Sequence, residues 1–318
     1  MTLTITRLSR SGAAEIGGVD CSRPLAAEVA ALVRQAFLDH PVLVFRTQPL
    51  DAVQFAAFAE QFGTLESFGT PGPLPKDGAG LDTSETAVLP ELSGRTDSNF
   101  YVYYHPDDSR VQFMTNAVRR DMPLMGIQDN AQTWHVDAQY RLNPNKMTFL
   151  NNVVSPSSGG DTEFGDMTLV YESLSDEVRN LLDPCIGIHQ WSKSKNFMFA
   201  GLLDDSVRAE GDRIAAAVPS MRHPLVRRHP DTGRPILFIS PRFTIAIEGL
   251  DAAVSESLLR ALFLAIDDPR FTYRHQWRDH DLVMWDNRRM VHHGYAYPRG
   301  DVRHINSITL CGERPEPM

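Results

Sequence analysis

WHVD at residues 134–137 decides how this sequence is interpreted, and WDNRRMVH at residues 285–292 complements it far downstream. Residues i and i+2 of an extended strand point to the same face of a sheet. His135 and Asp137 can therefore present an imidazole and a carboxylate to one metal ion, with His292 completing the set from another strand. Two histidines and one carboxylate on one face of an octahedron leave about three coordination positions open. This donor set predicts an Fe(II) site with room for a cosubstrate and O₂.

A histidine and an aspartate two positions apart also arise by chance, and His135 alone is equally compatible with a buried structural histidine. Three downstream features favour a site. The first is the segment Asp286-Asn287-Arg288, which precedes His292 at a fixed short spacing. GGDT at residues 159–162 begins 24 positions after His135 and supplies the hydroxyl of Thr162. Arg303 follows His292 by 11 positions, and an arginine there can form a bidentate salt bridge with a carboxylate. Each feature alone is a turn or a surface charge, but their joint order and spacing indicate a metal and cosubstrate site.

The joint pattern resembles the taurine/α-ketoglutarate dioxygenase family, that is, the TauD/TfdA-like Fe(II)-dependent dioxygenases. The family shares a WHxD box, a GGDT box, a WDNRxxxH box and a downstream arginine. These features stand here at residues 134–137, 159–162, 285–292 and at Arg303. The resemblance covers nearly the whole chain, because further family-like segments occur at residues 17–20, 42–46, 58–63 and 223–234.

The resemblance implies a mainly β protein with flanking helices and a double-stranded β-helix, or jelly-roll, core. It also implies that His135, Asp137 and His292 ligate Fe(II), and that Thr162 and Arg303 hold the distal carboxylate of 2-oxoglutarate. The implied reaction consumes O₂, releases succinate and CO₂, and oxidises a small organic acid or amino-acid-like metabolite. Hydroxylation is the commonest outcome in the family, while desaturation and ring closure stay open. Related halogenases lack the carboxylate, so Asp137 argues against halogenation.

The last family box differs in this chain. It usually reads RRxMxRxT, whereas residues 302–309 read VRHINSIT. Val302 replaces the first arginine, and Ser307 replaces the later arginine that grips the sulfonate in taurine dioxygenase. A serine cannot supply the charged fork with which arginine binds an anion. We therefore expect a substrate other than taurine, and any anion must be recognised by another residue.

Bulk properties limit the partners. The chain has 318 residues, a net charge of −9 and a pI of about 5.6, so no general basic field attracts nucleic acid. Its three cysteines form no CxxC pair, which fits a reducing compartment. The start of the chain lacks a secretory signal, and no apolar segment approaches the roughly 18 residues of a membrane span. We expect a cytoplasmic protein with a small-molecule substrate, no membrane partner and a possible homo-oligomeric state.

Length alone allows one or two domains, and the family resemblance implies a single domain over residues 1–318. Many short strands at this spacing favour a sandwich or jelly roll over a parallel sheet. Helices are predicted at residues 26–38, 51–62, 167–183, 204–216 and 251–266, and strands at 2–8, 15–20, 42–45, 147–154, 185–189, 224–228, 236–239, 271–276, 282–285 and 305–310.

Residues 64–98 lose this periodicity and are rich in Pro, Gly, Ser, Thr and Asp. Such an insertion is either a lid that closes over the site or a disordered surface loop.

Two other classes of function compete with the dioxygenase. A non-catalytic metal-binding or sensor protein on the same barrel has little need for Thr162 and Arg303, and a metal-dependent hydrolase or isomerase on a cupin-like barrel would require additional His or Glu ligands.

Overall fold

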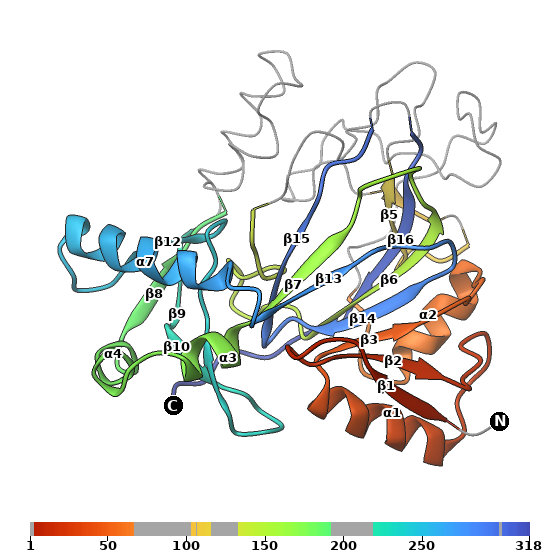
Figure 1. Cartoon of the computed structure of the whole chain (residues 1–318), viewed down its shortest axis with the longest axis horizontal. Helices are drawn as coiled ribbons and strands as arrows, with labels where there is room; N and C mark the ends of the chain where they lie inside the picture. Colours follow the sequence, from red (N-terminus) through yellow and green to blue (C-terminus); the bar gives the residue numbers. More distant parts are fainter. Residues whose placement is uncertain (1–2, 67–102, 106, 116–132, 192–218, 299–300) are drawn as a thin grey trace.

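The computed structural model describes residues 3–66, 103–105, 107–115, 133–191, 219–298 and 301–318, and Figure 1 shows the arrangement of their elements. The predicted helix at 204–216 and almost all of the 64–98 insertion lie outside the described residues.

The largest element is a sheet of eight strands in the order β1-β2-β3-β14-β6-β16-β5-β4. The strands are β1 (Thr4–Arg7), β2 (Ala13–Gly17), β3 (Val42–Phe45), β4 (Tyr103–Tyr104), β5 (Gln112–Thr115), β6 (Met147–Val154), β14 (Leu282–Asp286) and β16 (His304–Thr309). Among the described strands, β2 and β3 alone pair in parallel. The short apolar segments of β3 and β14 are buried along their whole length, because the sheet is covered on both faces at its centre.

Three smaller sheets complete the β structure. The first is antiparallel and has the order β13-β7-β15, formed by β13 (Thr272–His275), β7 (Thr162–Asp166) and β15 (Met290–Gly294). The others are β12-β8-β9 and β10-β11, formed by β8 (Ile186–His189), β9 (Met221–Pro224), β10 (Val226–Arg228), β11 (Pro235–Leu237) and β12 (Thr244–Ile247). The large sheet and the β13-β7-β15 sheet make the jelly-roll core, so the predicted mainly β architecture is confirmed.

Helices flank this core on two sides (Figure 1). α1 (Ala27–Asp39) and α2 (Ala52–Glu60) lie beside the large sheet, and their apolar faces share one core cluster with β3 and β14. α7 (Ala252–Ile266) packs near β12 and α3 in a second cluster. The predicted helix at 167–183 is instead two helices, α3 (Met167–Glu172) and α4 (Asp176–Leu182). The chain breaks there because Ser175 caps the second helix through its side chain.

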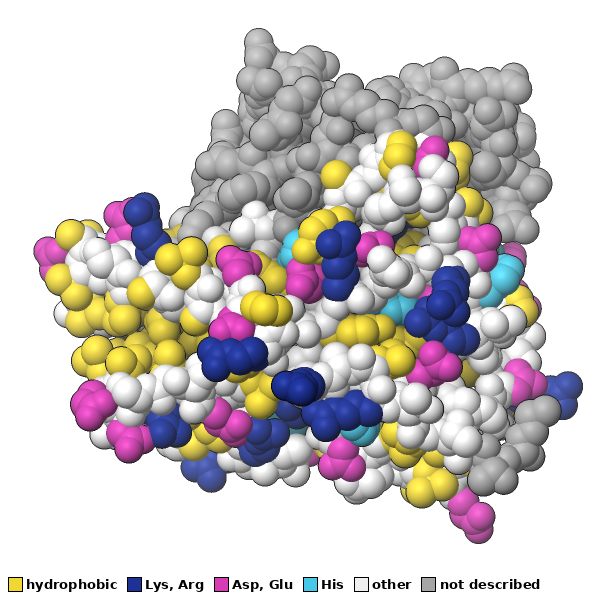
Figure 2. All heavy atoms as spheres, viewed as in Figure 1, with side chains coloured by type: hydrophobic (Ala, Val, Ile, Leu, Met, Phe, Trp, Pro, Cys, Tyr) yellow, Lys and Arg dark blue, Asp and Glu magenta, His cyan; other side chains and the backbone are white. Residues whose placement is uncertain are grey.

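The surface carries mixed charge. On the face drawn in Figure 2, basic and acidic side chains are interspersed among polar and apolar ones. Within the part of the chain that the structure describes, every helix is too short or too polar to cross a bilayer.

Candidate metal centre and cosubstrate pocket

The WHVD segment lies beside β15 through a single bridge. The His135 N–H donates to His292 O at 3.0 Å, and the His292 N–H donates to His135 O at 2.9 Å. The prediction of a regular strand at 134–137 is therefore wrong, because within this segment only His135 forms a β-bridge and Asp137 already begins a turn. Ala138 follows with φ of 55°, a left-handed conformation that turns the chain away from the sheet. The three side chains predicted as ligands nevertheless come together.

The ligand atoms of His135, Asp137 and His292 all lie within 4.8 Å of one another. Asp137 Oδ1 is 3.8 Å from His135 Nε2 and 3.6 Å from His292 Nε2. Among the described residues, no other group of three His, Cys, Asp or Glu side chains meets this condition. Two imidazoles and a carboxylate converging on one point are the donor set of a facial metal triad.

His135 is oriented for metal binding by its backbone neighbourhood. Its Nδ1 lies 2.9 Å from Thr133 O, so the ring donates its proton there and Nε2 presents a lone pair. Burial lowers the pKa of His135 well below its usual value, and the neighbouring His292 and Arg242 act in the same direction. A neutral imidazole with a fixed tautomer is the form that coordinates a divalent cation.

Asp137 uses its two oxygens differently. Asp137 Oδ2 accepts a hydrogen bond from Thr148 Oγ1 at 2.6 Å and another from Asn287 Nδ2 at 3.2 Å. Asn287 Nδ2 also donates to Thr148 Oγ1, and Asn287 Oδ1 accepts from Trp285 Nε1 at 3.0 Å. These bonds fix the plane of the carboxylate and direct Oδ1 toward the two histidines. In functional metal sites, a coordinating carboxylate is typically hydrogen-bonded by neighbouring side chains in this way.

His292 is enclosed by aromatic rings. Its ring centroid lies 4.8 Å from that of Trp285 and 6.3 Å from that of Phe164. Burial lowers the pKa of His292, Asp137 partly opposes this shift, and Arg242 adds to it. Its Nδ1 is buried and finds no hydrogen-bond partner among the described residues. The ring is therefore held by packing, with Nε2 facing Asp137.

Thr162 and His292 lie on one face of neighbouring strands. In the β7–β15 register, Phe164 is opposite His292 and Thr162 is opposite Gly294, so Thr162 and His292 share a face two positions apart. Trp277 Nε1 donates to Thr162 Oγ1 at 3.0 Å. Because that bond occupies a lone pair of the oxygen, the hydroxyl proton is directed elsewhere, available to an acceptor in the cavity.

Arg303 reaches the same cavity across the GGDT turn. Its Nη2 donates to Gly160 O at 3.1 Å, and burial lowers its pKa to about 10, so it is charged at neutral pH. Gly159 and Gly160 both have left-handed backbone conformations, with φ of 69° and 68°. A Cβ at Gly160 would lie 3.3 Å from Arg303 Nε, and a Cβ at Gly159 would lie 2.5 Å from Ala296 O. Gly160 therefore makes room for the arginine, and Gly159 allows the close approach of the Ala296 backbone.

The three predicted ligands, Thr162 and Arg303 line one cavity of about 280 Å³, close to the lower end of the range for small-molecule sites. Its other described lining residues include Glu66, Met114, Tyr140, Arg141, Thr148, Leu150, Arg242, Trp285 and Ser307. These side chains come from the large sheet, from β7 and β15 of the facing sheet and from the two turns near residues 138 and 242. The cavity therefore lies between the two sheets of the jelly roll.

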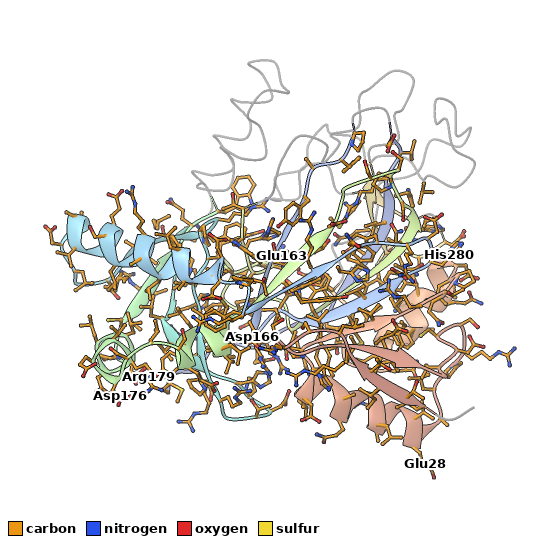
Figure 3. All side chains as sticks on the ribbon, viewed as in Figure 1. Glu28, Glu163, Asp166, Asp176, Arg179 and His280 are labelled. Carbon is orange, nitrogen blue, oxygen red and sulfur yellow. The ribbon has the colours of Figure 1, made fainter. Side chains whose placement is uncertain are left out.

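Buried ion pairs hold the backbone that carries His292. Asp286 accepts two hydrogen bonds from the Arg288 side chain, at 2.8 and 2.7 Å. Arg289 Nε donates to Asp166 Oδ1 at 2.9 Å, and Figure 3 shows Asp166 where β7 leads into α3. These pairs fix the turn between β14 and β15 from both sides. They explain why the WDNRxxxH segment contains the buried charged residues Asp286, Arg288 and Arg289.

His293 points to the other face of β15, as strand alternation predicts. Its Nε2 lies 3.2 Å from Glu163 Oε2, and its ring stacks edge-on against Trp134 at 4.3 Å between centroids. Trp134 in turn donates from Nε1 to Asp267 Oδ1 at 2.7 Å. Figure 3 labels Glu163 on the same strand as Asp166. This side of the sheet supports the metal ligands without entering the cavity.

Four residues near the site could not be identified from the sequence alone. Thr148, Asn287 and Trp277 act through hydrogen bonds whose partners are far away along the chain. Arg242 lies in no motif, and only the folded chain brings it into the cavity. Tyr140 also lines the cavity.

Comparison with known proteins identifies the family of the chain. Residues 4–309 match the family described as "Taurine catabolism dioxygenase TauD, TfdA family". The α-ketoglutarate-dependent 2,4-dichlorophenoxyacetate dioxygenase of Burkholderia sp. strain RASC is 34% identical over 273 residues, which are 86% of this chain and 82% of that protein.

Solved structures show the same fold. A taurine dioxygenase from Burkholderia xenovorans matches with a TM-score of 0.73 at 27% identity, covering 100% of this chain and 92% of that chain. A structure of AAD-2 in complex with Mn(II) and N-oxalylglycine matches with a TM-score of 0.72 at 25% identity, covering 99% of both chains. The chain belongs to the TauD/TfdA family and is an Fe(II)- and 2-oxoglutarate-dependent dioxygenase.

Proposed function

We propose that this enzyme oxidises a small organic anion, with Fe(II) held by His135, Asp137 and His292 and with 2-oxoglutarate anchored by Thr162 and Arg303. The observation that carries the proposal is the convergence of the three ligand atoms within 4.8 Å beside a buried arginine in the same cavity. When bound, iron and 2-oxoglutarate supply the oxidising power, because 2-oxoglutarate and O₂ are converted to succinate and CO₂ as the substrate is oxidised.

The donor set fits the metal. Both imidazoles are neutral because burial lowers the pKa of His135 and of His292. Hydrogen bonds to Oδ2 from Thr148 and Asn287 leave Asp137 Oδ1 as the coordinating oxygen. These three donors would hold Fe(II) from one side, and 2-oxoglutarate and O₂ would then have access to it from the cavity.

The polar end of the cavity fits the cosubstrate. Arg303 is charged and 6% exposed, and a buried guanidinium binds a carboxylate through charge-assisted hydrogen bonds. The Thr162 hydroxyl can donate to the same carboxylate, because its oxygen already accepts from Trp277. The protein thus positions the two ends of 2-oxoglutarate separately, one at the metal and one at Arg303.

The substrate class follows from two observations. The relatives named above act on 2,4-dichlorophenoxyacetate, a carboxylic acid, and on taurine, a sulfonic acid. In this chain Ser307 lines the cavity where taurine dioxygenase has its sulfonate-binding arginine, which argues against taurine itself. Hydroxylation is the proposed outcome, with desaturation or ring closure as variants of the same oxidation.

The free thiols of Cys21, Cys185 and Cys311 support a reducing, cytoplasmic location.

Spectroscopy and product analysis test the proposal together. Purified protein mixed anaerobically with Fe(II) and 2-oxoglutarate is expected to show the weak visible charge-transfer band of the chelate, and O₂ with a panel of organic acids is expected to yield succinate. Absence of both would contradict the proposal. The band without succinate would instead support a non-catalytic metal-binding protein.

Removal of one metal ligand should abolish the activity. His135→Ala and Asp137→Ala each remove one of the three protein donors of the facial site. For both variants we expect loss of the charge-transfer band and at least a ~100-fold drop in succinate formation. Asp39→Ala, at the surface end of α1, is the matched control and should behave like the wild type. A ligand variant that retained both signals would show that another residue coordinates the metal.

A further inference from the structure

We propose that Gln112, with Ser307 beside it, forms an uncharged hydrogen-bonding subsite for the far end of the substrate. The group that it binds is a neutral oxygen acceptor, such as a ketone, ester or ether oxygen, remote from the carbon that reacts. This inference rests on the proposed function, because it assigns one end of the same cavity. It also gives Ser307 a role that needs no charge.

The side-chain amide of Gln112 is a buried donor. Gln112 lies on β5 and lines the cavity. Its Nε2 atom is buried and has no hydrogen-bond partner among the described residues. A buried N–H group is unfavourable when it stays unpaired, so nearly all such groups in proteins have an acceptor. The amide therefore points to an acceptor on a molecule that binds in the cavity.

Strand register places Ser307 beside this amide. In the antiparallel pair of β5 and β16, which lie side by side in Figure 1, Gln112 is directly opposite Ser307. On the other side of β16, Ser307 is opposite Leu150 of β6. Directly opposite residues of an antiparallel pair project from the same face, and all three line the cavity. They form one row across three strands, in which Ser307, 5% exposed, adds a hydroxyl to the amide.

The distance of this row from the metal ligands fits the length of a small substrate. Thr309 of β16 is opposite Thr148 of β6, and Thr148 Oγ1 donates to Asp137 Oδ2 at 2.6 Å. Ser307 is two residues away from Thr309 along β16, which is roughly 7 Å. Gln112 is also two strands away from β6, which is roughly 10 Å. A substrate that reacts at the metal therefore reaches Gln112 with its far end.

The charges beside the subsite are already balanced. Glu66 accepts a hydrogen bond from Thr309 Oγ1 at 3.0 Å, so a carboxylate lies close to the row that contains Ser307. Glu66 forms an ion pair with Arg141, which balances both charges. A further anion at Ser307 would be repelled by the Glu66 carboxylate, whereas an uncharged oxygen can accept from Gln112 without this cost. The subsite therefore suits the uncharged end of an organic anion.

Calorimetry on a catalytically inert complex tests the proposal without turnover. The protein is loaded with Mn(II) and N-oxalylglycine, the pair found in the structure of AAD-2. It is then titrated with 4-acetylphenoxyacetate or with 4-isopropenylphenoxyacetate, two acids of nearly the same shape of which only the first has a carbonyl oxygen at its far end. We expect the wild type to bind the acetyl compound at least ~10-fold more tightly, a difference of about 1.4 kcal/mol.

Variants assign this preference to the amide. Gln112→Met keeps a similar volume and removes the donor, so it should bind the two compounds equally. Ser307→Ala keeps the amide and should retain a ~2- to 5-fold preference. Gln35→Met, an exposed change on α1, is the matched control and should keep the wild-type ratio. Each variant is first shown to bind Mn(II) and N-oxalylglycine, which confirms that its cavity is intact.

Two results would overturn the subsite. In the first, the wild type takes up Mn(II) and N-oxalylglycine but binds the two acids equally or binds neither. In the second, Gln112→Met keeps the preference for the acetyl compound, because the carbonyl is then recognised by another residue. A wild type that does not take up Mn(II) and N-oxalylglycine contradicts the proposed function instead, so the two failures are distinguishable.

Discussion

At the scale of single residues, the carboxylate of Asp137 shows how a common residue pair becomes a specific site. One oxygen faces the two histidines, and the other is held by Thr148 and Asn287. The sequence spacing could predict that His135, Asp137 and His292 meet, because the motifs fix which side chains converge. It could not predict the role of Asn287, since that role depends on an amide orientation set by Trp285.

Loss of the Asn287 amide should weaken metal binding while all three ligands stay in place. Asn287→Ala removes one of the two hydrogen bonds to Asp137 Oδ2 and frees the carboxylate to rotate. We expect the affinity for Fe(II), or for Mn(II) as a substitute, to fall by ~10- to 100-fold in a metal titration. Asn143→Ala, at an exposed position, provides the control. Equal metal affinity in both variants would show that Thr148 alone orients the carboxylate.

Truncation of Arg303 should affect the cosubstrate more than the metal. Without the guanidinium, the distal carboxylate of 2-oxoglutarate loses its charged partner, which is typically worth about 2–3 kcal/mol for a charge-assisted bond. We expect Arg303→Ala to raise the apparent KM for 2-oxoglutarate by ~30- to 100-fold with little change in Mn(II) affinity. An unchanged requirement for 2-oxoglutarate would refute the cosubstrate assignment.

At the scale of elements, local sequence signals predicted most helices and strands but not the shape of the site itself. β6 occupies 147–154 as predicted, and α2 lies within the predicted helix at 51–62, with Asp51 as its N-cap. The WHVD segment was expected to be a strand and is a bridge followed by a turn, because its conformation is determined by β15 and by the left-handed Ala138. Tertiary contacts of this kind leave no periodic trace in the sequence.

The capping box of α2 gives a measurable contribution to stability. Asp51 accepts from the Gln54 N–H at 2.8 Å, and the Gln54 side chain accepts from the Asp51 N–H at 3.0 Å. Asp51→Ala should lower the free energy of unfolding by about 1 kcal/mol in urea titrations. Val53→Ala, an exposed change in the same turn, should stay within about 0.5 kcal/mol of the wild type. Similar values for the two variants would mean that water replaces the cap.

At the scale of the whole molecule, buried histidines connect global stability to pH. His189 and His223 lie side by side, with ring centroids 5.4 Å apart, between β8 and β9. Burial lowers the pKa of His223 to about 4, and burial also lowers the pKa of His189 well below its usual value. Each is neutral in the folded protein, whereas the unfolded chain takes up a proton near pH 6.5. Their contribution is therefore complete above pH 6.5 and is lost as the pH falls toward 4.

His223→Gln should reduce this pH dependence. The glutamine amide can still donate to Arg141 O, the partner of His223 Nε2 at 2.9 Å, but it does not titrate. We expect the gap in unfolding free energy between wild type and variant to narrow by about 1 kcal/mol per pH unit below pH 6. Urea denaturation at pH 7.5 and at pH 5 measures this gap. A gap of constant size would show that the pKa of His223 is the same in the folded and the unfolded protein.

The order of strands in the large sheet also has a consequence for how the chain reaches its native state. β3 pairs with β14 through Phe45 and Leu282, which are 237 positions apart in the sequence. During synthesis the first three strands are complete long before their central partner leaves the ribosome, and they expose an apolar edge meanwhile. Such nonlocal pairing slows folding and lengthens the period in which aggregation competes. The yield of active enzyme should therefore depend on the rate of translation and on chaperones that protect this edge.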